Sequence, residues 1–520
     1  MKCICSYLVN IRSVNFHKLL GVLIGAAIIS GCGGREDTTD EEVGLPAPQV
    51  SMSLDLKQFI FRWGNIEGAN HYRLLENSDS VSGYTEIWQG TELSHSHIVP
   101  LFARISSSYI VSACNDSGCV NSDEVFVSGT LVDAIGYIKA SEVISWDTFG
   151  QTVLLSNDGK TLVVSAQRAG LVYIFYESNG SWSEVERIAS PSPDSIDWSG
   201  LNVAFNGDGD LISIYANGVV FIYERTHSGW VQQDTIDISL GVTSSWSEPI
   251  FLSDDGNTLA IGVEGNAYIY FRSTLGWLSQ EVLAGKGENL SLSDDGSTLA
   301  SADNNGSTVH IYSRVAGIWS PQDSIPIYVG WGPVFSFGDK GNTLAIGVSE
   351  ESSAAQGIDG DETDTSAYKA GAVYVYVRDT SGWSRQSYIK ASNSGGYDRF
   401  GYSVDVSSDG NALVVGAYGE DGASKGLNGE RNDNSGNVDS DGGSSGAAYF
   451  FIRKNGVWAE QAYLKPTNTE NYEEYGRSVA ISGDGNTIAV GDDYEASASS
   501  GVGSDDSDNS AYAAGAVFLY

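Results

Sequence analysis

The sequence is short of basic residues. Its 520 residues include 28 Lys and Arg against 66 Asp and Glu, which gives a formal net charge of −38. Nucleic-acid-binding proteins need a basic patch or stripe, and no segment of the chain provides one. We therefore exclude nucleic acid as a partner, and we expect an acidic surface that keeps the chain soluble or gathers cations.

Catalytic sequence motifs are also missing. The chain has no His-Glu-x-x-His motif, no P-loop and no dinucleotide-binding fingerprint. The strings "GASKG" (422–426) and "GGSSG" (442–446) match Gly-x-Ser-x-Gly, but neither stands between a strand and a helix as a nucleophile elbow does. We expect no enzyme, although a carboxylate pair that cleaves a polysaccharide is compatible with so acidic a chain.

Heptad repeats are absent, so long helices are not expected. Glycine is abundant at 62 residues and proline scarce at 10, and the aromatic residues comprise 27 Tyr, 17 Phe and 12 Trp. This composition favours short strands joined by glycine turns. The sequence therefore predicts an all-β protein.

Residues 1–31 have the features of an export signal. A basic start precedes the apolar run "LLGVLIGAAIIS" (19–30), which is too short for a permanent membrane span. The run leads into "ISGC", which resembles the lipobox of bacterial lipoproteins. The resemblance implies that the signal is cut before Cys32 and that Cys32 is acylated, and Gly33 after it implies the outer membrane of a Gram-negative cell envelope. Each buried CH₂ of an acyl chain contributes about 0.8 kcal/mol to anchoring. An ordinary signal peptide is the alternative.

A tether and a first domain follow. Residues 32–46 are polar, which predicts a flexible tether behind the lipidated cysteine. Residues 47–130 contain spaced strand patterns such as "FIFRW" and "SYIVSACN", a β-sandwich signature. Trp63, Tyr72 and the strand from Tyr109 resemble the pattern of fibronectin type III domains. We expect this domain to act as a spacer from the membrane.

Two cysteines remain in this domain. Cys114 and Cys119 are close in the sequence of an exported chain, which predicts a disulfide. The alternative is a zinc site that also uses His95 and His97, two residues apart on one strand.

From residue 131 the chain repeats. A turn dipeptide ending in glycine recurs seven times, and six of the seven are Asp-Gly. An aromatic strand follows each turn, and a tryptophan stands seven residues beyond each of the first six such strands. The turn glycines are Gly159, Gly209, Gly256, Gly296, Gly341, Gly410 and Gly485. The pattern within each unit predicts four short antiparallel strands, with a tight hairpin at the turn between the first two. Because such sheets bury their faces when packed radially, we predict a seven-bladed β-propeller over 131–520, with the tryptophans between blades.

The repeats resemble FG-GAP repeats, which build the propeller of integrin α subunits. The segments "AGAVYVYVRDTSGW" (370–383) and "FGYSVDVSSDGNALVVGAYGED" (400–421) carry this resemblance most clearly, and it weakens in the second to fourth units. The resemblance implies a ligand-binding propeller. The integrin calcium loop is not expected in the hairpins, because Leu413 and its counterparts stand where a closing carboxylate would be needed.

Acidic residues concentrate in three long connections, 349–370, 418–445 and 492–514. They share an ungapped frame, "GIDGDETDTS" (357–366), "GLNGERNDNS" (426–435) and "GVGSDDSDNS" (501–510). Equivalent connections of a propeller emerge on one face, so the loops predict one acidic surface. One interpretation is Ca²⁺ binding; the alternative is a set of solvated loops. The candidate ligands are Asp359, Asp361, Asp364, Asn428, Glu430, Asp433, Asp505 and Asp508.

The last strand, "GAVFLY" (515–520), has no fourth strand after it. The segment "GYIKAS" (136–141) matches the fourth strand "SYIKAS" (387–392) but has no unit of its own. We predict that Tyr137 and Ile138 pair beside Phe518 and Tyr520, so that strand 136–141 closes the ring and covers an exposed sheet edge.

The predicted function is a lipid-anchored, monomeric binding or adhesion protein of the cell envelope. Its ligand is expected to be a protein or a glycan on the acidic loop face. Two alternatives stay open: a surface enzyme that acts on a polysaccharide, and a periplasmic scaffold for envelope assembly.

Overall fold

Strands make up nearly all regular structure of the described chain. The computed structural model describes residues 44–190, 201–216, 218–238, 249–285, 287, 289–303, 307–327, 332–432, 444–470 and 472–520. Within these ranges the helices are the short 3₁₀ turns η1 (Leu101–Ala103) and η2 (Val132–Ala134). The all-β prediction is confirmed. No helix of these ranges has the length and apolar character to cross a membrane. The lipidation residue Cys32 lies outside the described residues.

The first domain is a pair of antiparallel sheets. One has the order β1–β2–β5, and the other has the order β4–β3–β6–β7 with β8 paired to β6. The strands are β1 (Val50–Asp55), β2 (Gln58–Trp63), β3 (His71–Asn77), β4 (Thr85–Gly90), β5 (Ser94–Ile98), β6 (Ser108–Asn115), β7 (Gly118–Asn121) and β8 (Val125–Phe126). Alternate residues of β2, Phe59, Phe61 and Trp63, are buried, as expected of a strand with one face in a core.

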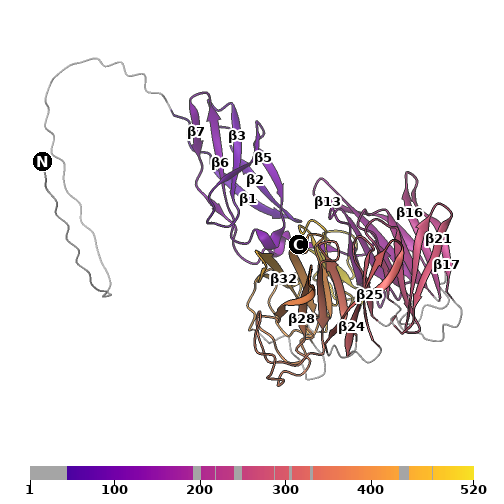
Figure 1. Ribbon diagram of the computed structural model, residues 1–520. Helices are drawn as coiled ribbons and strands as arrows, with labels where there is room; N and C mark the ends of the chain where they lie inside the picture. Colours follow the sequence, from indigo (N-terminus) through magenta and orange to yellow (C-terminus); the bar gives the residue numbers. More distant parts are fainter. Residues whose placement is uncertain are drawn as a thin grey trace, which may run out of the picture. The chain divides into compact units, whose positions relative to one another are not determined.

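The described residues form seven further four-stranded antiparallel sheets, numbered sheet 1 to sheet 7 in chain order. Figure 1 labels several of their strands, among them β13, β16, β25 and β32. The first strands are β10 (Phe149–Leu155), β14 (Asn202–Phe205), β18 (Ile250–Leu252), β22 (Leu290–Leu292), β26 (Val334–Gly338), β30 (Ser403–Val406) and β34 (Ser478–Ile481). The second strands are β11 (Thr161–Ala166), β15 (Leu211–Ala216), β19 (Thr258–Val263), β23 (Thr298–Ala302), β27 (Thr343–Val348), β31 (Ala412–Ala417) and β35 (Ile488–Asp492).

The outer strands complete the sheets. The third strands are β12 (Leu171–Ser178), β16 (Val219–Thr226), β20 (Asn266–Ser273), β24 (Thr308–Val315), β28 (Ala372–Asp379), β32 (Ala447–Lys454) and β36 (Ala516–Leu519). The fourth strands are β13 (Ser181–Ala189), β17 (Gly229–Asp237), β21 (Gly276–Leu283), β25 (Ile318–Pro326), β29 (Gly382–Ile389), β33 (Val457–Leu464) and, for sheet 7, β9 (Gly136–Ile138).

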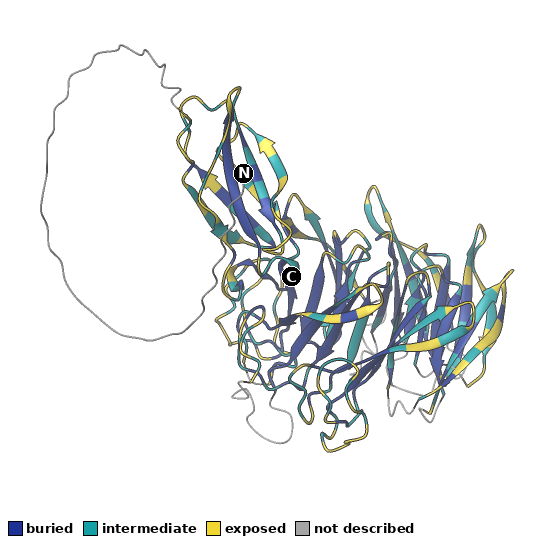
Figure 2. Cartoon of the chain, turned by 60° about the vertical axis from the view of Figure 1, so that its left-hand side comes forward, coloured by how far each residue is buried: buried dark blue, intermediate teal, exposed yellow. Residues whose placement is uncertain are grey.

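The first strands form a closed circuit. Each contacts the first strand of the next sheet, from β10 through β14, β18, β22, β26 and β30 to β34, and β34 contacts β10. The second strands are buried along their whole length, whereas the hairpins of the outer strands are exposed (Figure 2). This is the arrangement of a propeller-like fold.

The hairpin between the first and second strands is fixed by side chains. In sheet 6, Ser407 Oγ donates to Asp409 Oδ1 at 2.7 Å, and the N–H of Asn411 donates to the same oxygen at 2.9 Å. Gly410 has φ +72°, which only glycine adopts readily. Leu413, which follows, is fully buried. Serine donates to the turn aspartate in the same way in four other sheets, at Ser156, Ser253, Ser293 and Ser482. These hydrogen bonds hold the turn in shape.

Tryptophans of the fourth strands pack toward the preceding sheet. Trp319 and Trp458 are buried, and their indole N–H groups donate to Gln280 and Gln386 of the sheet before at 3.1 and 2.9 Å. For Trp319 and Trp458, the predicted position between neighbouring sheets is confirmed.

The segment before sheet 1 supplies the last strand of sheet 7. Tyr137 pairs with Phe518 and Ile138 pairs with Val517 in an antiparallel ladder. Tyr520 lies one residue beyond this ladder, and its N–H donates to the carbonyl of Ile488 in β35 at 2.9 Å. Both edges of β36 are thus occupied.

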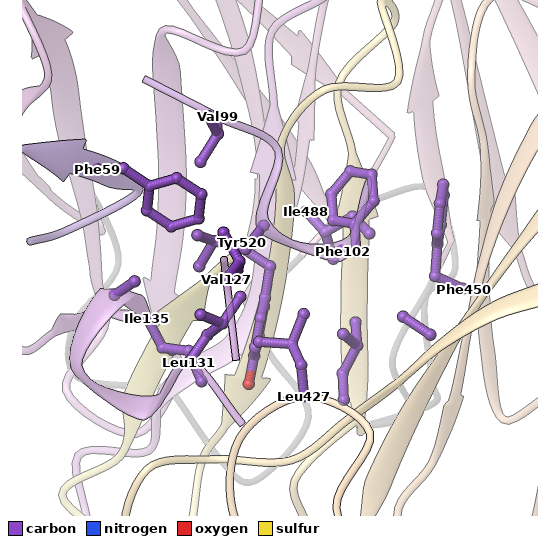
Figure 3. Packing of buried hydrophobic residues seen from close by; sticks show 14 of the residues in the cluster. Phe59, Val99, Phe102, Val127, Leu131, Ile135, Leu427, Phe450, Ile488 and Tyr520 are labelled. Carbon is purple, nitrogen blue, oxygen red and sulfur yellow. The ribbon is translucent and has the colours of Figure 1, made fainter. Parts of the chain in front are cut away.

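The sandwich shares a hydrophobic core with sheets 6 and 7. Phe102 of η1 lies 4.3 Å from Phe450 between ring centroids, and Phe59 and Val127 lie near Tyr520 (Figure 3). Tyr520 is completely buried, and its hydroxyl donates to the Lys465 carbonyl at 2.6 Å. Tyr520 is therefore enclosed by residues of the sandwich and the ring.

Candidate functional site

The two ends of the sheets differ. One end, the turn end, carries the Asp-Gly turns and the hairpins between third and fourth strands. The other, the loop end, carries the connections between second and third strands and those between sheets, because the strands are antiparallel. The sandwich contacts the turn end: Lys57 Nζ donates to Thr487 Oγ1 at 2.7 Å, and Gln58 and Ile98 lie beside Gly180 at the tip of a sheet 1 hairpin. At the loop end, the carbonyl of Thr130 accepts the N–H of Leu427 in the sheet 6 loop at 2.8 Å, whereas the loop carboxylates Asp361, Asp364, Asp505 and Asp508 stay exposed.

The shared frame of the three long loops has a structural role at its first residues. Its apolar residue forms a β-bridge to the fourth strand, as Ile358 with Ile389, Leu427 with Leu464 and Val502 with Ile138. The next residue caps this contact in two loops. Asp359 Oδ1 and Asn428 Oδ1 accept the N–H groups of Tyr388 and Tyr463 at 2.9 and 2.8 Å. These two predicted calcium ligands thus hold the loop against the sheet.

The later residues of the frame form local turns. Asp364 and Asp508 accept the N–H of the serine two residues later, at 3.1 and 3.0 Å, which explains the shared Asp-x-Ser. Asp361 and Asp505 accept both the N–H and the hydroxyl of Thr363 and Ser507, respectively. These bonds lower the pKa of both carboxyls, with the Thr363 and Ser507 side chains as the largest causes. Such Asx turns need no cation.

The calcium prediction has no support from the described residues. In this part of the chain no three His, Cys, Asp or Glu side chains come together as a metal site. Glu430 is exposed, and Asp433 lies outside the described residues. Calcium binding by these loops therefore stays a prediction.

An ion pair with a fully buried lysine lies beneath each of the three loops. Lys139, Lys390 and Lys465, which follow the fourth strands, lie 2.6, 2.8 and 3.1 Å from Glu495, Glu351 and Glu420 of their own sheets' loops. Burial lowers the pKa of each lysine, and the partner glutamate opposes this shift. A lysine recurs at the same place in the "YIKAS" and "YLKPT" segments, and this repetition could have indicated the ion pairs. Sequence reasoning assigned no role to these lysines.

Amide bridges join two neighbouring sheets at the same depth. Asn393 Nδ2, after the fourth strand of sheet 5, donates to Glu420 Oε1 of sheet 6 at 2.9 Å. Asn468 Nδ2 donates in the same way to Glu495 Oε1 of sheet 7, also at 2.9 Å. Each of these glutamates therefore ties its loop to two sheets.

Sheet 7 holds an additional buried acid. Asp492 stands at the end of β35, where β31 has Ala417, and it is completely buried. Burial, followed by repulsion from Glu473 and Glu495, raises its pKa well above the usual value, although the backbone of Tyr494 opposes this. Burial likewise raises the pKa of Glu473 to about 8. These carboxyls lie where the loop end meets the contact between sheets 6 and 7.

Exposed aromatic side chains stand above the buried pairs. Tyr368 and Tyr397 pack edge to face with centroids 5.3 Å apart, and Trp146 and Tyr512 pack 4.6 Å apart. Each pair joins a long loop to the connection that enters the next sheet. Sequence reasoning missed these residues, although Trp146, Tyr397 and Tyr472 each stand three residues before the aromatic residue that opens a repeat.

The cysteines of the sandwich form a disulfide. Cys114 and Cys119 are bonded at 2.05 Å and face each other across the β6–β7 hairpin. Both sulfurs are thereby used, so the zinc alternative is wrong. His95 instead stacks on Trp88 with centroids 5.0 Å apart, and His97 Nε2 lies 3.5 Å from Glu76 Oε1.

A cavity of about 1110 Å³ lies between the sandwich and the turn end. Burial lowers the pKa of Lys57 at its wall to about 7, against the attraction of Asp484 and Glu177. Two charged groups at its wall are engaged: Asp409 accepts hydrogen bonds within its own turn, and Arg453 Nε donates to Asn411 at 3.1 Å.

Comparison with known proteins supports the repeat family locally. The FG-GAP repeat model matches residues 383–451 and 458–520, which lie in sheets 5 to 7. The predicted resemblance is confirmed for these residues. No curated protein matches the chain.

Solved structures with similar backbones are distant. Hydrazine synthase of Kuenenia stuttgartiensis is 12% identical with a TM-score of 0.42, over 68% of this chain and 94% of that one. A Lactobacillus plantarum protein is 12% identical with a TM-score of 0.39, over 77% and 98%. A Bacteroides uniformis protein, provisionally named a 6-phosphogluconolactonase, is 11% identical with a TM-score of 0.40, over 77% and 98%. At these scores the similarities decide nothing about activity.

Proposed function

We propose that this chain is a lipid-anchored binding or adhesion protein of the cell envelope that presents its loop end to a ligand. The observation that carries the proposal is the position of the sandwich. Lys57 donates to Asn486 and Thr487 at the turn end, and the loop carboxylates Asp361, Asp364, Asp505 and Asp508 stay exposed, so the domain that follows the tether leaves these parts of the loop end open. A protein that presents a surface to a ligand needs that surface to stay free of its own neighbouring domain.

The proposal includes the finer fold assignments. The seven sheets are taken as seven blades of an integrin α-like propeller, and the first domain as a fibronectin type III-like spacer. The propeller assignment is supported by the closed circuit of first strands and by the ladder between β9 and β36. The spacer assignment is supported by the division of β1–β8 into two antiparallel sheets. Acylation of Cys32 and an outer-membrane location complete the proposal.

We propose binding and not catalysis because the loop carboxylates are engaged in hydrogen bonds within their own loops. Asp361, Asp364, Asp505 and Asp508 each accept hydrogen bonds from their own loop. A general acid and base for polysaccharide cleavage would instead need a pair of carboxyls with separated pKa values at one sugar-binding site. These four serve to shape the loops.

Protease treatment of intact cells tests the proposal. Cells that produce the full chain are exposed to a protease that cannot enter them, and fragments are detected by an antibody against the sandwich. We expect cleavage within the long loops on intact cells. Protection until the outer membrane is permeabilised would contradict surface display and favour the periplasmic scaffold.

A further inference from the structure

Exposed aromatic residues gather at the loop end. Among the described residues, seven aromatic side chains are exposed, and only Phe126 and Phe271 lie elsewhere. The other five are Trp146, Tyr368, Tyr397, Tyr472 and Tyr512, which are 46–54% exposed. They belong to the connections of sheets 5, 6 and 7 and to the entry into sheet 1, so they occupy one part of the ring.

The backbone fixes these residues where sheets meet. The N–H of Tyr397 donates to the carbonyl of Tyr368 at 2.8 Å, and the N–H of Trp146 donates to that of Tyr512 at 2.9 Å. Tyr472 occupies the equivalent position between sheets 6 and 7, where its N–H donates to Ser444 at 3.1 Å. The three positions therefore share one local structure.

This local structure is unfavourable for a large side chain. Trp146, Tyr397 and Tyr472 have φ angles of 74°, 71° and 71°, in the left-handed region where glycine is preferred. An L-residue there is strained. Half-exposed rings recover only part of the burial energy that a core position would give. Retention of an exposed aromatic residue at three strained positions points to a role in binding.

The surroundings of the pairs favour a cation. Lys369 Nζ lies 5.3 Å from the centroid of Tyr368, and the Arg168 guanidinium lies 4.9 Å from that of Trp146, so these rings already accept cations of the chain itself. Asp364 and Asp508 are exposed four residues before Tyr368 and Tyr512. Aromatic faces next to carboxylates attract ammonium and guanidinium groups.

We infer that the aromatic pairs and their carboxylates form a docking surface for a Lys- or Arg-rich segment of a partner protein. The inference rests on the proposed function and names the class of its ligand. Charge complementarity selects this occupant, because the chain carries 66 acidic against 28 basic residues and its loop end is acidic. A neutral glycan, which would also stack on aromatic rings, is the competing occupant.

Calorimetry on the full chain in detergent tests the inference, with a ten-residue Arg-Gly peptide and a neutral oligosaccharide as probes. We expect the peptide to bind and its affinity to fall as salt is raised. In the double variant Tyr397→Ala/Tyr512→Ala, we expect affinity to fall roughly tenfold. Tyr397→Phe/Tyr512→Phe, which keeps both rings, and Phe126→Ala, which removes an exposed ring of the sandwich, should match the parent.

The other outcomes separate the inference from the proposed function. Peptide affinity unchanged in the alanine variant, with melting temperatures equal to the parent's, overturns the inference. Oligosaccharide binding without peptide binding overturns it too, but leaves a surface binding protein. Binding of neither probe also overturns it, and protease treatment of intact cells then decides the proposed function separately.

Discussion

Lys139 Nζ lies 2.6 Å from Glu495 Oε2, and both side chains are completely inaccessible to solvent. Lys139 follows the strand β9 that precedes sheet 1, whereas Glu495 belongs to the loop between β35 and β36. Tyr137 of β9 also donates to Glu495, at 2.9 Å. One carboxylate therefore connects the closing strand to the long loop of sheet 7.

Removing the lysine should weaken the closure of the ring. Lys139→Ala leaves Glu495 buried without its counter-ion, and we expect the free energy of unfolding to fall by about 3–5 kcal/mol. Urea denaturation followed by tryptophan fluorescence measures this. The control is Arg187→Ala, which breaks the exposed pair with Glu142 and should cost less than about 1 kcal/mol. Equal losses in the two variants would contradict a structural role for the buried pair.

Stability should fall as the pH rises toward 8. The folded-state pKa of Glu473 is about 8, against an ordinary value of 4.5, so folding takes up a proton between these values. This contribution is complete below about pH 4.5 and is lost as pH approaches 8, at no more than about 1.4 kcal/mol per pH unit. Melting temperatures from pH 5 to pH 9 measure the loss.

Glu473→Gln provides the comparison. Its amide does not titrate, so the melting temperature should depend less steeply on pH than in the parent. The buried carboxyls Asp492 and Glu495 and the ammonium of Lys465 face the same site and remain in both proteins. Identical pH dependence in parent and variant would show that Glu473 does not carry the effect.

Replacing a strained aromatic residue by glycine should distinguish its effect on folding stability from its effect on peptide binding. Tyr397→Gly relieves a left-handed φ of 71°. We expect unfolding stability to stay unchanged or to rise by up to about 1 kcal/mol, because the strain is offset only by a half-exposed ring. Thermal denaturation and peptide titration are measured on the same sample. A clear loss of stability would show that the ring serves the fold.

Calcium should not change the melting temperature. The described loop carboxylates are used in Asx turns and strand caps, as Asp361 and Asp359 illustrate. We expect equal melting temperatures in millimolar Ca²⁺ and in a chelator. A calcium-dependent rise that disappears in Asp433→Asn would instead support a site that includes residues outside the described ranges.

The repeats made much of the ring predictable. The Asp-Gly turns, the aromatic third strands and the match between 136–141 and 387–392 are local patterns with fixed spacing. The contact of Lys57 with Thr487 was not predictable, because it joins residues 430 positions apart without any shared pattern. The loop frame was recognised, but its bridges to the fourth strands and its local turns were not predicted. The sequence Asp-x-Ser is compatible with a cation ligand and with an Asx turn. Only the position of the serine N–H in the structure distinguishes the two.

Cysteine labelling of the loop end tests the central proposal most directly. Asp361→Cys places a thiol at an exposed position of the sheet 5 loop, and Leu275→Cys places one on an exposed hairpin at the turn end. Intact cells are treated with a maleimide that cannot cross membranes. We predict labelling of Asp361→Cys on intact cells to the level reached after permeabilisation. Labelling of either variant only after permeabilisation would contradict a surface-displayed binding protein.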